Sequence, residues 1–499
     1  MKKHAALDIS LLFLFFMKIQ SLIREQDRLV PVDVEINFTA GLPQIQFLGL
    51  PDQGIKESIH RIKSAIRAQG FEFPKAQQVL VNLRPNHLKK SSRGLELAVA
   101  LGILWESGQV TAPKDSDFYI YGEIGLSGEV FEPDDLVADF DPLEETHVWT
   151  GQGALAPAVF QRSVLNTLKD LQNPTCIDSL PRTYEVQRPL TGLDLEFPAR
   201  QAELLSLVAL GEHSVLLAGP AGSGKSTIAR TLPTLLNAPS TEEMHVIVRN
   251  NKTANSDVPR WRPVVHPHHS TTPLGLIGGG VPPFKGEITR AHKGVLILDE
   301  LLEFHPRAQE ALREPMEESC IRLRRGKFME EHPAETLVIS TTNLCPCGDW
   351  VPGARVVCGR SLRKCQSYSE RLSGPLVDRF QMAFFTSKKE EGLRMTGQKI
   401  LEHIEEVREF RNKLAEKDLR FKKVAGFWRF EELTADLPAF YMRELFPKEI
   451  SSRRRELATL RVARSFADLA KSEKLQPAHI EAALKLTYQP FEALKRLGC

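Results

Sequence analysis

The sequence predicts a multidomain α/β protein, with an α+β N-terminal region, a central α/β domain built on a parallel sheet, and a helical C-terminal region. Three observations lead to this prediction. Near residue 220 a short apolar strand, a glycine-rich turn and the start of a helix follow one another. Residues 294–298 form a continuous apolar run, which suits an inner strand that helices cover on both faces. Residues 399–414 and 453–469 carry apolar side chains at helical spacing.

The composition is that of a globular protein of several domains. A chain of 499 residues suggests about two to four domains. The hydrophobic content of 42% and the charged content of 26% are ordinary for a folded, water-soluble chain. The formal net charge of +2 excludes a strong overall attraction to nucleic acid or to a membrane surface. Any site for a polyanion must therefore be a local patch.

The N-terminal residues imitate a secretion signal without meeting its requirements. Lysines at positions 2 and 3 precede the apolar run 11–16, but Asp8 interrupts the pattern and no small-residue cleavage site follows. The run is also too short to span a bilayer. We interpret residues 1–16 as a leader or start-site extension.

Seven cysteines, four of them between 345 and 365, favour a reducing compartment. We expect a cytoplasmic protein without a membrane segment.

The most specific motif is a nucleotide phosphate loop of the form G-x-x-x-x-G-K-[ST]. Its eight positions are Gly219, Pro220, Ala221, Gly222, Ser223, Gly224, Lys225 and Ser226. Residues 214–218 predict a buried strand before the loop, and Thr227 continues into a helix. The glycines let successive backbone N–H groups surround an anion at the helix N-terminus. Lys225 can reach the β- and γ-phosphates, and Ser226 can hold Mg²⁺. We predict that the loop and Thr227 bind a nucleotide.

Two later strands end in polar residues that suit the same chemistry. The apolar run 294–298 leads directly into Asp299, which can hold Mg²⁺, and Glu300, which can polarise an attacking water. The strand predicted over 336–342 ends at Asn343. Asn343 either senses the γ-phosphate and orients the water, or it only caps the following turn. With the phosphate loop, these residues predict hydrolysis of ATP.

The N-terminal region reads as an α+β domain, which we place at residues 17–185. Alternating apolar residues predict a hairpin over 29–47, and a second hairpin is expected over 119–130. Helices are expected over 54–69 and 95–105, with a strand over 79–83 between them. The acidic segment 132–145 that follows is interpreted as a solvated loop.

Several short motifs in this region resemble the N-terminal domain of the ComM/YifB proteins, a family of bacterial magnesium-chelatase-like AAA+ ATPases. The matching segments are Gly49-Leu50-Pro51-Asp52, Lys56-Glu57-Ser58, Gly70-Phe71-Glu72-Phe73-Pro74 and Val81-Asn82-Leu83. The resemblance implies an S5-like fold, similar to the protease domain of Lon. Gly94 stands where Lon has its serine nucleophile, so a Lon-like protease is disfavoured.

The resemblance continues through the central and C-terminal regions. It implies a P-loop AAA+ domain at residues 186–388 and a helical lid at residues 389–499. The segment from Ser373 to Phe380 resembles the family's Ser-Gly-Pro-Leu-Leu-Asp-Arg motif, which makes Arg379 the expected arginine finger, donated to the neighbouring subunit; Arg371 is the reserve candidate. Arg453 matches the Ser-x-Arg of the second sensor, which reaches the nucleotide from the lid.

Two further features leave alternatives open. Residues 321–328 predict a hairpin with a basic tip, which either contacts nucleic-acid phosphates in a ring pore or is a solvated turn. A cluster of cysteines follows the strand that ends at Asn343, and it either encloses structural Zn²⁺ or consists of reduced thiols. Its members are Cys345, Cys347, Cys358 and Cys365.

The function that the resemblance implies is an ATP-hydrolysing ring motor that acts on DNA. ComM-like proteins drive branch migration of DNA during natural transformation, so a DNA helicase or translocase is expected. The expected partners are further copies of the chain, in a hexameric ring, and single-stranded or branched DNA. The expected cofactors are ATP and Mg²⁺. The alternatives are a magnesium-chelatase-type motor and an ATP-switched scaffold without DNA activity.

Overall fold

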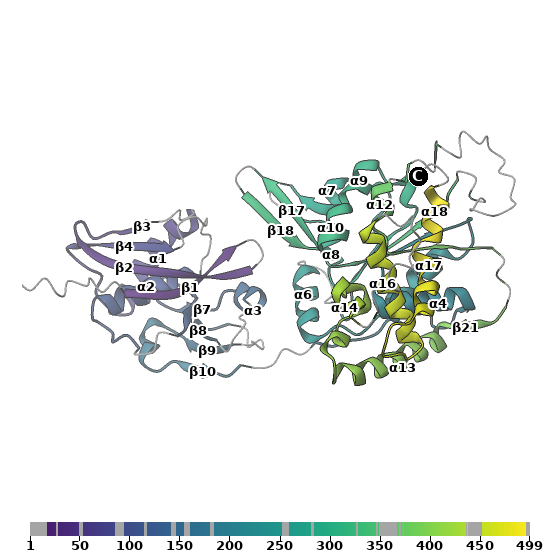
Figure 1. Ribbon diagram of the computed structural model, residues 1–499. Helices are drawn as coiled ribbons and strands as arrows, with labels where there is room; N and C mark the ends of the chain where they lie inside the picture. The colour runs from purple at the N-terminus through teal and green to yellow at the C-terminus, as the bar shows by residue number, and fades with distance from the viewer. Residues whose placement is uncertain are drawn as a thin grey trace, which may run out of the picture. The chain divides into compact units, whose positions relative to one another are not determined.

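In the computed structural model the chain forms two compact units, Met1–Thr183 and Tyr184–Cys499 (Figure 1). The residues that the structure describes are 17–25, 28–48, 53–84, 94–113, 117–140, 146–153, 160–179, 184–251, 259–280, 284–325, 328–345, 348, 367–368, 371–372, 374–388, 390, 392–435, 437 and 452–495. The expected leader, residues 1–16, lies outside this set. Within the described part of the chain, no helix combines the length and apolarity needed to cross a bilayer.

A mixed sheet of eight strands forms the centre of the N-terminal unit, in the order β10-β9-β8-β5-β1-β2-β4-β3. Its strands are β1 (Met17–Glu25), β2 (Arg28–Ala40), β3 (Ile45–Leu48), β4 (Gln77–Arg84), β5 (Tyr119–Ile120), β8 (His147–Gly151), β9 (Gln161–Leu165) and β10 (Thr175–Ile177). The hairpin predicted over residues 29–47 is wrong. β4 lies between β2 and β3, antiparallel to β2 and parallel to β3. The alternating pattern identified two strands, but β2 pairs instead with β1 and β4.

Two helices pack on this sheet, α1 (Gln53–Ala68) and α2 (Leu95–Glu106), and both were predicted. Every residue of α2 except Glu106 is buried, which explains its apolar composition. The buried carboxylate of Glu96 accepts hydrogen bonds from Ser58 Oγ at 2.7 Å and from Ile124 N at 3.0 Å, and it also pairs with Arg61. These bonds satisfy a charge that would otherwise be costly to bury. They join α1 to α2 and to the short strand β6 (Glu123–Ile124).

The residue before α2 cannot carry a side chain. A Cβ atom on Gly94 would lie 2.3 Å from Cε2 of Tyr121. The Tyr121 hydroxyl is held by the carboxylate of Asp135 in α3 (Asp135–Asp139), at 3.1 and 3.2 Å from its two oxygens. The Tyr121 ring thus fills the space that a nucleophile at position 94 would need. The hairpin predicted over 119–130 exists in part, as the antiparallel pair of β6 with β7 (Val130–Phe131).

A fully parallel sheet of five strands forms the centre of the second unit, in the order β13-β16-β19-β12-β20. Its strands are β12 (Val215–Ala218), β13 (Val264–Val265), β16 (Val295–Leu298), β19 (Leu337–Thr342) and β20 (Met382–Phe385). The predicted strands before the phosphate loop, before Asp299 and before Asn343 are all confirmed. All four residues of β16 are buried, as the apolar run predicted. The order places β12 between β19 and β20, so the phosphate loop leaves from the interior of the sheet.

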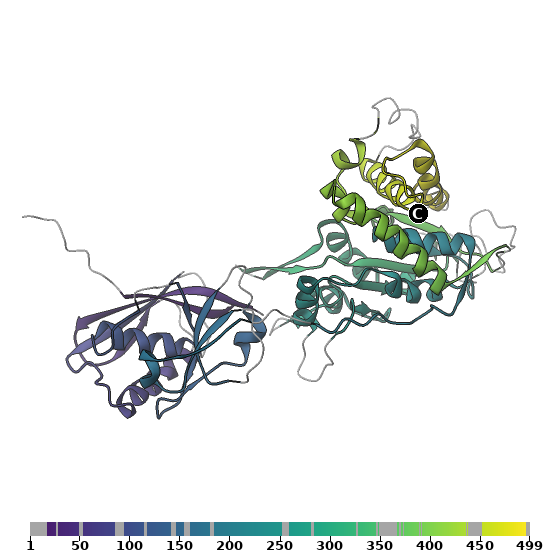
Figure 2. The same ribbon diagram turned by 90° about the horizontal axis from the view of Figure 1, so that it is seen from below.

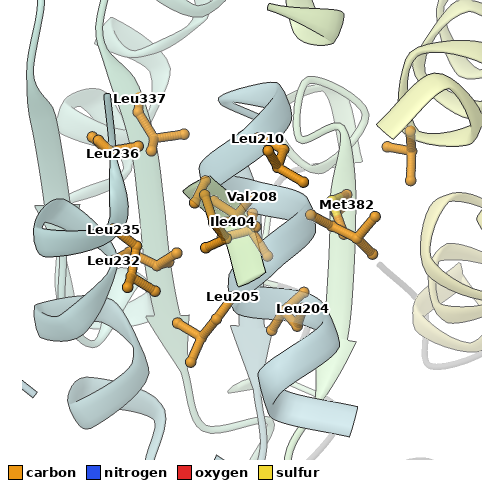
Figure 3. Close-up of a cluster of buried hydrophobic side chains, with 14 of the residues drawn as sticks. Leu204, Leu205, Val208, Leu210, Leu232, Leu235, Leu236, Leu337, Met382 and Ile404 are labelled. Atoms are coloured by element: carbon orange, nitrogen blue, oxygen red, sulfur yellow. The ribbon is translucent and has the colours of Figure 1, made fainter. Parts of the chain in front are cut away.

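Helices cover both faces of this sheet because alternate residues of each strand point to opposite sides. On one face, Leu217 and Ile339 join a core made by α4 (Ala199–Gly211), α5 (Lys225–Leu235) and α13 (Gly397–Ala415). Figure 3 shows Val208 of α4, Leu232 of α5 and Ile404 of α13 in this core. On the other face, Leu216 and Val338 join residues of shorter helices. Those helices are α7 (Pro273–Ile277), α8 (Glu287–Arg290), α9 (Pro306–Ala311), α12 (Gly374–Val377) and α18 (Gln489–Lys495).

The C-terminal part is helical, as predicted. Its main helices are α13, α14 (Phe430–Thr434), α16 (Arg453–Leu469), α17 (Pro477–Thr487) and α18. Ser452 caps α16, its side chain accepting from the backbone N–H of Arg455, and Pro477 stands at the first position of α17. Figure 2 shows these helices, in green and yellow, gathered beside the teal sheet domain. The remaining described α-helices and strands are α6 (Thr241–Asn251), α10 (Arg313–Glu318), β11 (Glu196–Pro198), β14 (Gly278–Gly279), β15 (Phe284–Lys285), β17 (Cys320–Arg325), β18 (Phe328–Pro333) and β21 (Arg394–Thr396).

A buried histidine joins the sheet domain to α16. His213, just before β12, is fully buried. Its Nδ1 lies 2.6 Å from Gln381 Oε1, and its Nε2 lies 2.8 Å from Ser465 Oγ in α16. Burial lowers the pKa of His213 from 6.5 to about 4, although the hydrogen bond to Gln381 opposes the shift. The imidazole is therefore neutral at physiological pH.

The lowered pKa predicts that acid weakens the folded state through His213. Between pH 6.5 and about 4 the unfolded chain binds a proton at this position and the folded chain does not. The free energy of unfolding should therefore fall by up to about 3 kcal/mol as the pH drops through this window. Urea unfolding at several pH values should show a shallower dependence for His213→Asn than for the wild type. Identical slopes would contradict this assignment, because all other titrating groups are shared.

Candidate functional site

The phosphate loop joins β12 to α5 and has the backbone geometry of an anion cradle. Gly222 and Gly224 have positive φ angles of 75° and 88°, which side-chain-bearing residues rarely adopt. A Cβ atom at either position would meet no atom within 4 Å, so both glycines border open space. Gly219 is required for a different reason, since its Cβ would lie 2.1 Å from Thr386 Oγ1. Thr386 also lies 2.6 Å, Oγ1 to Oγ, from Ser223, and it thereby supports the loop from the end of β20.

Lys225 is buried at the start of α5, and its ammonium group lies at the centre of the site. Its Nζ donates to the carbonyl oxygens of Gly219 and Pro220, both at 2.8 Å, and to Oδ1 of Asn343 at 3.0 Å. Burial lowers the pKa of Lys225, while the carboxylates of Asp299 and Glu300 act in the opposite direction. The structure therefore brings the predicted lysine and the predicted sensor asparagine into direct contact.

Ser226 and Asp299 meet beside this lysine. Ser226 Oγ lies 3.2 Å from each carboxylate oxygen of Asp299. The Thr341 hydroxyl donates to the same carboxylate. Hydroxyl and carboxylate oxygens are the ligands that Mg²⁺ prefers. The Ser226 hydroxyl and the Asp299 carboxylate lie beside a loop that presents backbone N–H groups. This arrangement fits a magnesium ion bound to a nucleoside triphosphate.

Glu300 follows Asp299 in a strained backbone conformation. Its φ of 55° is left-handed, which is uncommon for a residue with a side chain and is concentrated at functional sites. Its backbone N–H donates to Thr341 Oγ1 at 3.0 Å, and its side chain is exposed. Thr341 thus supports both acids from the neighbouring strand. No local pattern in the sequence pointed to Thr341, because it reaches the acids only through the pairing of Leu298 with Ser340 in adjacent parallel strands.

Gly348, which follows β19, also contacts the phosphate loop. The backbone N–H of Ala221 donates to the carbonyl oxygen of Gly348 at 2.7 Å. The backbone N–H of Gly348 donates to the carbonyl of Cys345 at 3.0 Å. The phosphate loop is therefore held by residues that follow both β19 and β20.

The candidate finger Arg379 lies just after α12, where three groups of its own chain hold it. Its Nε donates to the Arg313 carbonyl at 3.1 Å, Nη1 donates to the Pro375 carbonyl at 2.7 Å, and Nη2 donates to Glu317 Oε2 at 2.6 Å. The side chain is 16% exposed. It is a fixed guanidinium that still reaches the surface. The reserve candidate Arg371 is exposed, and its guanidinium lies 5.6 Å from the centre of the Tyr368 ring.

Three consecutive arginines begin α16, and each has a different environment. Arg453, the predicted second sensor, is exposed, and its guanidinium lies 4.3 Å from the centre of the Phe430 ring. Arg454 pairs with Glu317 and with Asp378 at 3.5 Å. Arg455 is buried, donates to Asp378 Oδ1 at 3.0 Å, and donates to the carbonyl of Phe380 at 2.9 Å. Burial lowers the pKa of Arg455 despite its partner Asp378.

The carboxylate of Glu317 accepts hydrogen bonds from both Arg379, which follows α12, and Arg454 of α16. It therefore connects these two segments. Partial desolvation alone would raise the pKa of Glu317, but the two guanidiniums hold it below the ordinary value. The sequence carried no sign of this residue, because its partners are about 60 and 140 positions away.

The predicted basic hairpin exists as the antiparallel pair β17 and β18, in which Arg325 pairs with Phe328. Its tip, residues 326–327, lies outside the described residues. Arg322 is bound to Glu318 and Glu331, so it is already neutralised within the hairpin base. A contact with nucleic-acid phosphates at the tip stays a prediction.

Of the predicted cysteine cluster, only Cys345 belongs to the described residues, where it is buried. Cys347, Cys358 and Cys365 lie outside them. Among the residues that the structure does describe, no group of three or more His, Cys, Asp or Glu side chains has a metal-binding arrangement. The zinc site therefore stays a prediction without support from the described residues.

Comparisons with known proteins agree with the site. A family model described as "Magnesium chelatase, subunit ChlI" matches residues 194–393, and one described as "Subunit ChlI of Mg-chelatase" matches residues 34–138. The chain is 32% identical to the "Uncharacterized protein YifB" of Escherichia coli over 374 residues, which cover 71% of this chain and 72% of that protein. It is 28% identical to the "Competence protein ComM" of Haemophilus influenzae over 495 residues, covering 91% and 94%. It is 31% identical to an uncharacterized protein of Mycobacterium tuberculosis over 376 residues, covering 70% and 73%.

Proposed function

Because the chain belongs to the ComM/YifB family of magnesium-chelatase-like AAA+ proteins, we propose that it is an ATP-hydrolysing ring motor that acts on DNA. The observation that carries the ATPase part is the meeting of four groups at one edge of the parallel sheet. These groups are the ammonium of Lys225, the hydroxyl of Ser226, the carboxylate of Asp299 and the amide of Asn343. They come from the ends of three adjacent strands, where α/β sheets bind nucleotides.

Each group has a defined part in the proposed hydrolysis. The N–H groups of the phosphate loop, assisted by Lys225, bind the β- and γ-phosphates. Asn343, held by Lys225, orients the attacking water, and Glu300 polarises it. A bound Mg²⁺, held by Ser226 and Asp299, supplies positive charge beside the phosphate oxygens. Arg379 of a neighbouring protomer stabilises the charge that develops on the γ-phosphate, and Arg453 reaches the same nucleotide from the helical lid.

The DNA part of the proposal rests on the similarity, over 91% of the chain, to the competence protein ComM. The family resemblance implies branch migration during natural transformation, carried out by a hexameric ring in the cytoplasm. The segment that we assign to the DNA contact is the tip of the β17–β18 hairpin, in or next to which the sequence carries Arg324, Arg325 and Lys327, since a near-neutral chain needs a local basic surface to hold a polyanion.

Turnover of ATP in the presence of different DNA structures tests this proposal. The full chain should hydrolyse ATP, and a synthetic four-way junction should raise the rate several-fold above the rates with linear duplex or without DNA. Lys225→Ala is the control, because it removes the ammonium that binds the phosphates and should abolish turnover with every DNA. Basal turnover that no single-stranded, duplex or branched DNA changes would contradict the DNA part and leave the ATPase part standing.

A magnesium-chelatase-type motor is the second candidate, because both matching family models are described as magnesium-chelatase subunits. That activity would couple the same ATP hydrolysis to metal insertion and would not respond to DNA. The junction experiment therefore separates the two. An ATP-switched scaffold is distinguished by tight ATP binding with negligible turnover.

A further inference from the structure

A cavity of about 270 Å³ opens directly beside the phosphate loop. Its lining includes Gly222, Gly224 and Thr227, together with residues of β11 and β21, which pair antiparallel. A nucleotide whose phosphates lie on the loop has to place its ribose and base in the space next to it. This cavity borders the loop at the residues that lead into α5, so it is positioned to receive the nucleoside.

Glu390 lines this cavity, and one of its carboxylate oxygens has no visible use within the described residues. Gln201 of α4 is 7% exposed, and its Nε2 donates to Glu390 Oε2 at 3.4 Å. The second oxygen, Glu390 Oε1, is out of contact with solvent and has no hydrogen-bond partner among the residues that the structure describes. An acceptor that is buried without a partner is costly, and such groups commonly mark the place of a ligand.

We propose that Glu390 recognises the nucleoside of the bound nucleotide. Its Oε1 accepts a hydrogen bond from an N–H or O–H group of that nucleoside. A carboxylate only accepts, so it selects for an N–H or O–H group. The nucleoside of ATP carries two kinds of donor, the ribose hydroxyls and the 6-amino group of adenine. Gln201 is the positioning residue, because its amide holds the other carboxylate oxygen. This inference rests on the proposed function only in requiring that the phosphate loop binds a nucleotide.

Binding of nucleotide analogues tests the proposal and identifies the donor. The ligands are ATP, ITP, which replaces the 6-amino group with an oxygen, and 2′-deoxy-ATP and 3′-deoxy-ATP, each of which lacks one ribose hydroxyl. The wild type should bind at least one analogue about tenfold or more weakly than ATP, since hydrogen bonds to charged groups are the strong ones. A weakened ITP assigns the contact to the base, and a weakened deoxy analogue assigns it to the ribose.

Two variants complete the experiment. Glu390→Ala removes both acceptor oxygens, so the preference for ATP over that analogue should fall to about one. Glu402→Ala is the control, because Glu402 is an exposed carboxylate of α13 outside the cavity lining and its variant should keep the wild-type preference. If all four ligands bind the wild type equally, or if Glu390→Ala keeps the preference, the inference is overturned while the ATPase proposal stands. If the wild type binds no nucleotide at all, the proposed function fails first. If Glu390→Ala does not fold, Glu390→Asp, which shortens the side chain by one methylene, should lower the same preference, and an unchanged preference in that variant overturns the inference.

Discussion

Glu300→Gln should lower the rate of ATP turnover by about 100-fold or more while ATP affinity stays within about threefold of the wild type. The reason is that binding of the phosphates and activation of the water depend on different groups in the proposed site. In the proposed mechanism the phosphates are bound by the loop and Lys225, whose hydrogen bonds do not involve the Glu300 side chain. In that mechanism the carboxylate at position 300 serves only to polarise the water, and a neutral amide of the same size cannot accept its proton.

The measurement pairs a steady-state turnover assay with equilibrium binding of a fluorescent ATP analogue. Glu303→Gln is the matched control, since Glu303 lies three positions further on and accepts from Tyr368 at 2.8 Å. That variant should retain most of the wild-type rate. If Glu300→Gln turns over ATP at the wild-type rate, Glu300 does not activate the water, and the left-handed backbone at this position needs another explanation.

Arg379→Ala should bind ATP normally but lose turnover by about 1,000-fold, because an arginine finger acts on the transition state and contributes little to ground-state binding. Among the described residues, the Arg379 side chain donates to Glu317 and to the carbonyls of residues 313 and 375, none of which belongs to the phosphate loop of its own chain. A role in hydrolysis therefore requires a second protomer. Arg371→Ala tests the reserve candidate and should keep most of the turnover if Arg379 is the finger; its guanidinium is exposed and lies 5.6 Å from the centre of the Tyr368 ring.

Mixing two inactive variants distinguishes action on a neighbour from action within one chain. Arg379→Ala protein keeps its own phosphate loop, and Lys225→Ala protein keeps its arginine. In randomly mixed rings, about a quarter of the interfaces should combine an intact loop with an intact finger and recover activity. A mixture that stays inactive, although light scattering shows that the two variants co-assemble, would rule out Arg379 as a finger donated between protomers.

The parts of the site that lie close together in sequence could be predicted, and the parts that depend on neighbouring strands could not. The phosphate loop and the pair Asp299 and Glu300 are each continuous in sequence, with a strand before them that fixes their place at the sheet edge. Thr341 and Thr386 support these groups from adjacent strands, and the strand order that brings them there is not written in any local pattern.

The same limit explains the wrong hairpin in the N-terminal unit. The alternation over residues 29–47 correctly indicated strands, but alternation does not identify the partner of a strand. β4 arrives about 30 residues later and pairs with both β2 and β3. At α16 the helix start at Arg453 was predicted, whereas the burial of Arg455 was not. Its partner Asp378 belongs to a distant segment, and the local sequence Arg453-Arg454-Arg455 is uniformly basic.

Ion pairs connect the segment that follows α12 to helix α16 at two points. Arg454 and Arg455 of α16 hold Asp378, and the adjoining Arg379 shares Glu317 with Arg454. A shift of α16 would therefore act directly on the segment that carries Arg379, because Asp378 and Glu317 connect the two.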